Sequence, residues 1–256
     1  MTTPIRLLVV TGLTLCAALW AMPGTAHAQI FVGNVTGTIG EYTTSGGTVN
    51  AALVSGLSHP DGIAVSGGDL FVANGAGTVG EYTTSGTTIA TSLITGLNYP
   101  TGVAISWNDL FVANYVFGTI GEYTTSGAAV NASLISGLSL PLGIAISGND
   151  LFVVNSRNDG GGSVGEYTTS GATVNASLVS GLSLAEDIAI SGNDLFVTFS
   201  PGTVSEYTTS GATVNASLIS GLNDPDAIVI SPVPEPSAVA LAGFGGLSLL
   251  FLRRRK

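Results

Sequence analysis

Hydrophobic and polar positions alternate in short clusters that recur in the same order five times along the chain. The string Glu-Tyr-Thr-Thr-Ser-Gly begins at Glu41, Glu81, Glu122, Glu166 and Glu206, so successive copies are 40, 41, 44 and 40 residues apart. The apolar clusters around it are short, rich in β-branched and aromatic residues, and bounded by Gly, Asn, Asp or Pro. This pattern is typical of short antiparallel strands, and no helical periodicity interrupts it.

Each repeat contains four such strands. In the second copy they begin near Gly62, Leu70, Val79 and Ser92. Four strands in about 41 residues match one blade of a β-propeller. The chain starts on the second strand of a blade and ends on a first strand at residues 227–230, which we expect to complete the first blade and hide its edge.

We therefore predict an all-β fold: a β-propeller of five four-stranded blades over residues 29–231, closed by the C-terminal strand and followed by a C-terminal hydrophobic helix. Two alternatives remain at this point. One is an open or six-bladed arrangement that needs a partner. The other is a stacked β-solenoid, which the length of the repeat disfavours because solenoid coils usually repeat every 20–30 residues.

Glycine-rich turns join the first two strands of each repeat. Ser66-Gly67-Gly68-Asp69 and its counterparts at 147–150 and 191–194 supply the positive-φ residues of tight hairpins. One copy departs from the pattern, because Trp107 replaces the first glycine.

The N-terminal 28 residues have the organisation of a secretory signal peptide. Arg6 precedes an apolar run, and Ala26-His27-Ala28 provides a cleavage site after Ala28. Cleavage would remove Cys16, the only cysteine, and would leave His59 as the only histidine. The exported protein would then have no disulfide and no thiolate metal site. An uncleaved anchor helix is the alternative.

The C-terminal end has three parts in a fixed order: Pro234-Glu235-Pro236, an apolar stretch at 238–252, and a basic end at 253–256. This order resembles the PEP-CTERM sorting signal of Gram-negative bacteria, a tail that is also labelled as the C-terminal domain of ice-binding proteins. The resemblance implies a short transmembrane helix, cleavage by an exosortase-type membrane protease, and delivery to the outer surface or to the extracellular (biofilm) matrix. A plain C-terminal membrane anchor is the alternative.

The repeats themselves resemble the NHL/SMP-30-like propellers. The resemblance rests on Pro60-Asp61-Gly62-Ile63-Ala64-Val65, on Gly68-Asp69-Leu70-Phe71-Val72-Ala73-Asn74 and on their counterparts in the other units. Members of that superfamily include lactonases, lyases and binding modules, and their rings commonly have six blades. This chain departs from the pattern where Asp187 and Ala227 replace the glycine of the first strand.

Charge excludes one class of partner. Residues 29–233 contain 15 carboxylates and one base, Arg157, so this span carries 15 − 1 = 14 net negative charges. Such a domain repels phosphate backbones, which excludes nucleic-acid binding.

Carboxylates also gather at one predicted edge of the propeller. The loops that lead into the first strands contain Asp61, Glu186, Asp187, Asp224 and Asp226. These side chains could form a cation rim at the channel mouth, since Ca²⁺ binds six to eight oxygen ligands. We expect no cofactor other than Ca²⁺. The alternative is that these residues only shape turns.

The function expected from the sequence is that of an exported, exosortase-processed structural or binding protein of the cell surface or extracellular matrix, with its ligand unassigned. Its partners would be the exosortase-type protease and then an extracellular polysaccharide or other surface proteins. The alternative is a metal-dependent hydrolase or lyase, lactonase-like, with its site at the channel mouth. No residue is singled out as catalytic.

Overall fold

The computed structural model describes residues 29–34, 36–43, 47–157 and 161–222, together with positions 225, 227, 228 and 230. All regular structure in these residues is β, in 19 strands. No helix within the described ranges is long and apolar enough to cross a membrane. The predicted signal peptide and the predicted C-terminal helix lie outside the described residues.

The strands form five sheets, which we number as blades I to V in chain order. Blade I contains β1 (Gln29–Asn34), β2 (Thr38–Thr43) and β3 (Thr48–Ser55). Blade II contains β4 (Pro60–Ser66), β5 (Asp69–Asn74), β6 (Thr78–Thr83) and β7 (Thr88–Ile94). Blade III contains β8 (Pro100–Ser106), β9 (Asp109–Asn114), β10 (Thr119–Thr124) and β11 (Ala129–Ile135). Blade IV contains β12 (Pro141–Ser147), β13 (Asp150–Asn155), β14 (Gly162–Thr168) and β15 (Thr173–Leu182). Blade V contains β16 (Ala185–Ser191), β17 (Asp194–Phe199), β18 (Thr203–Thr208) and β19 (Thr213–Ser220).

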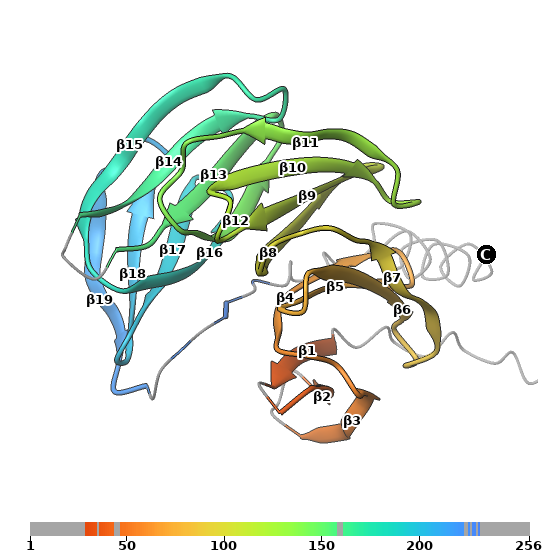
Figure 1. The fold of residues 1–256 in the computed structure, drawn as a ribbon. Helices are drawn as coiled ribbons and strands as arrows, with labels where there is room; N and C mark the ends of the chain where they lie inside the picture. The colour runs from red at the N-terminus through yellow and green to blue at the C-terminus, as the bar shows by residue number, and fades with distance from the viewer. Residues whose placement is uncertain are drawn as a thin grey trace, which may run out of the picture.

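Within each blade the strands follow one another as an antiparallel meander. The first strands of blades II to V, namely β4, β8, β12 and β16, contact one another in sequence and form the centre of the ring. The blades fan out from this centre (Figure 1). The prediction of an all-β propeller with five blades is confirmed.

Blade I has three strands within the described residues, and positions 227, 228 and 230 are not in a strand there. One contact nevertheless places this segment where the next first strand should be. A Cβ on Gly62 would meet Val103 N of the following blade, and one on Gly143 would meet Ile188 N. The same relationship continues from Asp187 to Ile228, whose backbone nitrogen lies 2.8 Å from an Asp187 carboxylate oxygen.

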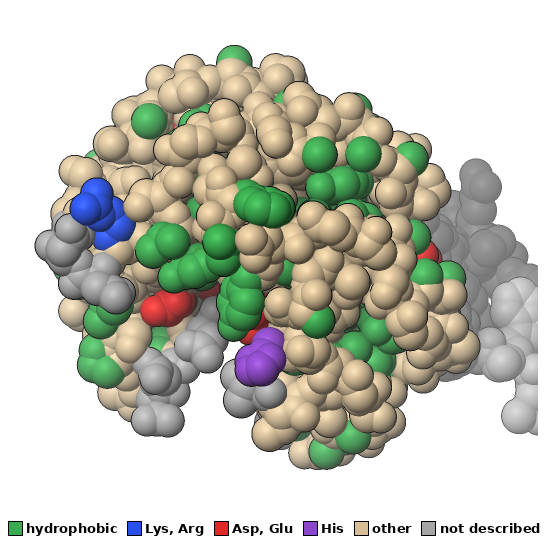
Figure 2. Space-filling view, viewed as in Figure 1, with side chains coloured by type: hydrophobic (Ala, Val, Ile, Leu, Met, Phe, Trp, Pro, Cys, Tyr) green, Lys and Arg blue, Asp and Glu red, His purple; other side chains and the backbone are tan. Residues whose placement is uncertain are grey.

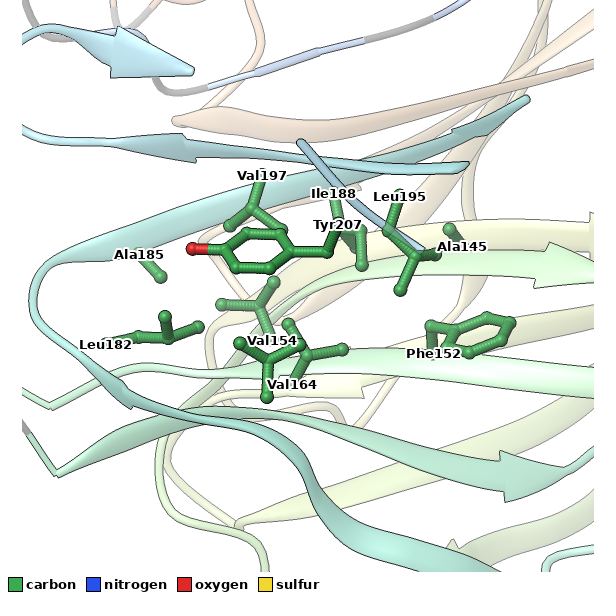
Figure 3. Packing of buried hydrophobic residues seen from close by; sticks show 11 residues of the cluster. Ala145, Phe152, Val154, Val164, Leu182, Ala185, Ile188, Leu195, Val197 and Tyr207 are labelled. Atoms are coloured by element: carbon green, nitrogen blue, oxygen red, sulfur yellow. The ribbon is translucent and has the colours of Figure 1, made fainter. Parts of the chain in front are cut away.

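The hydrophobic core lies between blades. Each of the four core clusters is shared by two neighbours: blades I and II, II and III, III and IV, and IV and V. Between blades IV and V, for example, Phe152 and Val154 of β13 face Leu195 and Tyr207 of blade V (Figure 3). The alternation of side chains along each strand therefore supplies one apolar face to each neighbouring blade.

The tyrosine of the repeated Glu-Tyr pair is a core residue. Tyr82 is buried and its side chain lies over Gly80, so that a Cβ there would come within 2.7 Å of the hydroxyl oxygen and 2.8 Å of a ring carbon. Burial raises the pKa of Tyr82, and a hydrogen bond with the Asn74 side chain partly opposes this. Tyr123 with Asn114 and Tyr167 with Asn155 repeat the arrangement. The motif therefore has a structural role in these blades.

The Thr-Thr-Ser-Gly that follows is a hairpin turn. Thr83 Oγ1 accepts a hydrogen bond from Thr87 N at 2.9 Å and lies 2.8 Å from Ser85 Oγ. Gly86 has φ +86°, and a Cβ on it would come within 2.5 Å of Leu53 O in the preceding blade. Only glycine satisfies both the backbone conformation and this close approach.

The junction between blades V and I is the least covered part of the ring. In the outer strands of blades II to IV, one apolar residue is only 3–7% exposed: Ile94, Ile135 or Val179. Its counterpart in β19, Ile219, is 46% exposed. On the other side of the junction Val32 is 40% exposed, while its counterpart Val72 is fully buried. Blades I and V therefore each keep one apolar face that the described residues do not cover.

Candidate functional site

Two sets of loops meet on one face of the propeller. One set leads into the first strands, and the other joins the second and third strands of each blade. In blades II to V the residue that precedes the first strand adopts a left-handed conformation although it is not glycine: His59 (φ 48°), Tyr99 (φ 53°), Leu140 (φ 50°) and Leu184 (φ 55°). This conformation costs free energy for any residue with a Cβ, so something must stabilise it.

A recurring hydrogen bond provides that stabilisation. The carbonyl of each left-handed residue accepts a bond from the first residue of the other loop in the same blade. The pairs are Gly75 N with His59 O at 3.0 Å, Tyr115 N with Tyr99 O at 3.1 Å, Ser156 N with Leu140 O at 3.1 Å, and Ser200 N with Leu184 O at 3.0 Å. Both loops of a blade are thus held together by a backbone hydrogen bond.

These loops expose apolar and aromatic side chains. Val116 and Phe117 are each 58% exposed, Tyr99 is 40% exposed and Leu140 is 39% exposed. Tyr115 packs against Tyr99 with ring centroids 5.9 Å apart at 59°. We call these five residues the mouth patch. Figure 2 shows hydrophobic side chains gathered on this face, with a histidine, a basic side chain and carboxylates around them.

Tyr99 connects blades II and III at this face. A Cβ on Gly75 would come within 3.1 Å of His59 Cβ and 3.2 Å of the Tyr99 ring, so the three residues are closely packed. The charge of Asp61 raises the pKa of Tyr99, and burial and Tyr115 raise it further. The phenol is therefore neutral at physiological pH and can donate a hydrogen bond.

The centre of the ring is too crowded for side chains at one position. Cβ atoms on Gly62 and Gly102 would come within 2.2 Å of the backbone oxygens of Thr101 and Leu142 in the next blade. Blade V has Asp187 at this position, and its Oδ2 accepts the hydrogen bond from Ile228 N. Between the earlier blades, a glycine lies close to the backbone of the next first strand. After blade V, the Asp187 carboxylate makes the contact with the following segment instead.

The surroundings of Asp187 are specialised in a second way. Asp187 N donates a hydrogen bond of 2.9 Å to Thr198 Oγ1, and that hydroxyl donates to Asp187 O at 3.4 Å. Thr198 is buried, and blades II to IV have alanine or valine at its position. Burial raises the pKa of Asp187 from 3.8 to about 6, while hydrogen bonds from Ile228 and Ile188 oppose the shift.

The predicted cation rim is described only in part. Asp61 lies on β4 near Tyr99, and Glu186 and Asp187 lie on β16. Within the described ranges no group of three or more His, Cys, Asp or Glu side chains could hold a metal ion. Asp224 and Asp226 lie outside the described residues, so the rim of five stays a prediction.

Two features were not identified from the sequence. The mouth patch was missed because Val116 and Phe117 belong to a loop, where no strand pattern draws attention to them. Thr198 was missed because its partner Asp187 becomes a neighbour only through strand pairing. A signal existed in both cases, since these residues break the consensus of the repeat.

Comparison with known proteins identifies the tail. Residues 232–256 match the PEP-CTERM protein-sorting motif. The predicted motif Pro234, Glu235 and Pro236 lies within this match, which implies an exported protein that is anchored transiently in the membrane of a Gram-negative bacterium and processed by exosortase. The signal peptidase site after Ala28 stays a prediction. No curated protein matches the chain.

Solved structures with a similar fold include a nidogen/laminin complex (16% identity, TM-score 0.66, 79% of this chain and 81% of that chain). A streptogramin B lyase has 20% identity and a TM-score of 0.59, over 80% of this chain and 70% of the other. A gluconolactonase from Xanthomonas campestris has 15% identity and a TM-score of 0.61, over 77% and 74% of the two chains. At these identities the similarity establishes the fold alone.

Proposed function

We propose that this protein is a binding component of the bacterial cell surface or extracellular matrix, and that it contacts its partner through the mouth patch. The sorting motif at 232–256 supports the location. The observation that carries the binding role is the exposure of Tyr99, Val116, Phe117 and Leu140 on loops that hydrogen bonds hold in place.

Exposed apolar groups of this kind mark interaction surfaces in soluble domains. Aromatic anchors contribute most when they are rigid before binding, because little conformational entropy is then lost. The left-handed backbone at Tyr99 and its ring contact with Tyr115 restrict these two tyrosines. A net charge of −14 over residues 29–233 further favours neutral or basic partners.

Cell fractionation tests the proposed location. We compare the full chain with a variant that lacks residues 232–256, in a Gram-negative host that contains exosortase. The full chain is expected at the outer surface or in the matrix, and the shortened chain in the periplasm or the medium. Retention of both versions in the inner membrane would refute the sorting role.

Paired substitutions test the mouth patch. Val116→Ser removes an apolar group that is 58% exposed within the patch, and Val130→Ser removes one that is 56% exposed at the start of β11, outside it. We expect the first variant to lose retention by matrix material from the native cells and the second to keep it. Equal retention of both variants would exclude the patch as the contact surface.

Calcium titration tests the cation rim. Because the described part of the rim forms no group of metal ligands, binding there would depend on Asp224 and Asp226. Calorimetry that detects no heat, together with an unchanged melting temperature, would dispose of the site.

A hydrolase or lyase is the second candidate, and Asp187 is the observation that favours it. Its raised pKa of about 6 is suitable for proton transfer near neutral pH, and two structures of similar fold are named as a lyase and a gluconolactonase. Turnover of a lactone that Asp187→Asn abolishes without loss of the fold would support this candidate. Undiminished turnover in that variant would exclude Asp187 as the catalytic group.

A further inference from the structure

Trp107 occupies a position that glycine fills in the other blades. It lies in the turn between β8 and β9 and has φ +57°. The counterparts in blades II, IV and V are Gly67, Gly148 and Gly192, with φ of 60–61°. The Trp107 side chain is 92% exposed, so it contributes almost nothing to the core. Blade III therefore carries an aromatic ring in a strained conformation that the fold does not require.

The ring borders a pocket of about 370 Å³ between blades II and III. This pocket lies among the hairpins that join the first and second strands and those that join the third and fourth, on the face opposite the mouth patch. Blade III contributes Trp107, Asn108, Thr125 and Ser126, and blade II contributes Asp69 and Glu81.

The two carboxylates of the pocket lie on the same side of blade II. Asp69 pairs with Thr83 and Phe71 pairs with Glu81, so Asp69 and Glu81 are two positions apart along adjacent strands. Burial raises the pKa of Glu81, and the charge of Asp69 raises it further. Hydrogen bonds that a ligand donates to these oxygens would stabilise both carboxylates in their ionised form.

The wall that blade III contributes carries hydroxyl and amide groups, which can donate hydrogen bonds as well as accept them. Thr125 N donates to Asn108 O at 2.9 Å, which holds the two hairpins of blade III together. Ser126 Oγ lies 2.8 Å from Thr124 Oγ1, so its hydroxyl is held in position. An amide, hydroxyls and carboxylates thus surround one side of an exposed indole.

We propose that the pocket beside Trp107 is a saccharide-binding site that takes one unit of a neutral polysaccharide. The indole would pack against the C–H face of the sugar ring, and Asp69 and Glu81 would accept hydrogen bonds from its hydroxyl groups. Two carboxylates disfavour an anionic sugar, and two are few for Ca²⁺, which binds six to eight oxygens. The site does not rest on the mouth patch or on its proposed partner.

The repeat supplies an internal control for this proposal. The corresponding position between blades III and IV has Asp109, Glu122, Asn149, Thr169 and Ser170, but Gly148 instead of tryptophan. Gly148 has φ +60°, and a Cβ on it would meet no atom within 4 Å. Trp107→Gly therefore removes the indole and restores the consensus turn, while Gly148→Trp adds an indole to a matching set of polar groups.

Trp107 also provides the signal for the experiment, because the only other tryptophan, Trp20, lies in the predicted signal peptide. The exported protein is titrated with laminarin, dextran and cellohexaose, and binding is followed by indole fluorescence and by calorimetry. We expect saturable binding of at least one of these glucans, with affinity reduced about tenfold or more in Trp107→Gly and reduced in Glu81→Gln. Gly148→Trp is expected to increase the calorimetric stoichiometry.

The proposal would be overturned by the absence of saturable binding of any of the three glucans, or by equal binding by the wild type and Trp107→Gly. A response to Ca²⁺ alone would also overturn it in favour of a cation site. Val130→Ser, outside both the mouth patch and the pocket, should leave glucan binding unchanged. Failure of the two proposals is distinguishable, because retention by matrix material tests the mouth patch and glucan binding tests the pocket.

Discussion

The Oδ2 atom of Asp187 accepts a hydrogen bond of 2.8 Å from the backbone nitrogen of Ile228, 41 residues further along the chain. This contact joins the first strand of blade V to the segment that follows the last blade. It occurs at the position where the other first strands approach one another through glycine. Asp187 therefore acts as a side-chain link at the junction of the ring.

The burial of the Asp187 carboxyl makes stability depend on pH. The pKa of Asp187 is raised from 3.8 to about 6, so the folded state binds this proton more tightly than the unfolded state does. The resulting stabilisation is fully present below about pH 4 and is lost as the pH rises through about 6, with a total near 3 kcal/mol. Urea unfolding at several pH values measures it.

Asp187→Asn is the matched variant for this measurement. Asparagine keeps an oxygen that can accept the Ile228 N–H and has no charge to bury. We expect this variant to be more stable than the wild type at pH 7 and to lose the part of the pH dependence that Asp187 contributes, while Glu81, Glu122 and Glu166, whose pKa values burial also raises, keep their part. An unchanged pH profile would mean that other groups cause it.

The hydroxyl of Thr198 should be necessary for the same junction. Thr198→Val keeps the shape of the side chain but leaves the Asp187 N–H without its acceptor. Loss of a partner for a buried donor costs about 1–3 kcal/mol of unfolding free energy. Thr173→Val, on the exposed start of β15, should change stability by less than about 0.5 kcal/mol. Equal effects in chemical denaturation would contradict this role.

Gly80 should not tolerate a side chain. A Cβ there would lie 2.7–3.0 Å from atoms of the Tyr82 side chain, which is itself packed between two blades. We expect Gly80→Ala to destabilise the protein by about 1–3 kcal/mol through overpacking. Gly68→Ala is the control, since a Cβ at that position would meet no atom within 4 Å. Thermal unfolding of the two variants should separate them clearly.

Trp107 should be dispensable for folding. A left-handed conformation costs a residue with a Cβ about 1–2 kcal/mol, and the flexibility of glycine in the unfolded chain offsets part of the gain from its removal. We expect Trp107→Gly to be at least as stable as the wild type, by up to about 1 kcal/mol. A loss of more than about 1 kcal/mol would reveal a packing role that the 92% exposure of the side chain does not suggest.

The repeat made the blades predictable. Strand alternation assigns Val79 to the interface with one neighbour and Tyr82 to the other, and the core clusters have this arrangement. The hairpins at Gly67 and Gly148 follow from turn chemistry. Local patterns of this kind predict the structure because each depends on a few adjacent residues.

The candidate sites were less accessible to sequence reasoning because they form between blades. The pocket beside Trp107 brings together Glu81 and Thr125, which are more than one repeat apart. The link from Asp187 to Ile228 depends on the close approach of first strands, which periodicity does not specify. In each case the only trace in the sequence was a residue that departed from the consensus.

Sharing of the core between blades has a consequence for the order in which the structure opens. A blade with a partner on both sides is held by two hydrophobic clusters, whereas blades I and V are each held by one within the described residues. In such a chain of nearest-neighbour contacts, opening begins at the weakly held ends and advances inward. Amide protons in blade III should therefore exchange most slowly with solvent, and those of blades I and V most rapidly.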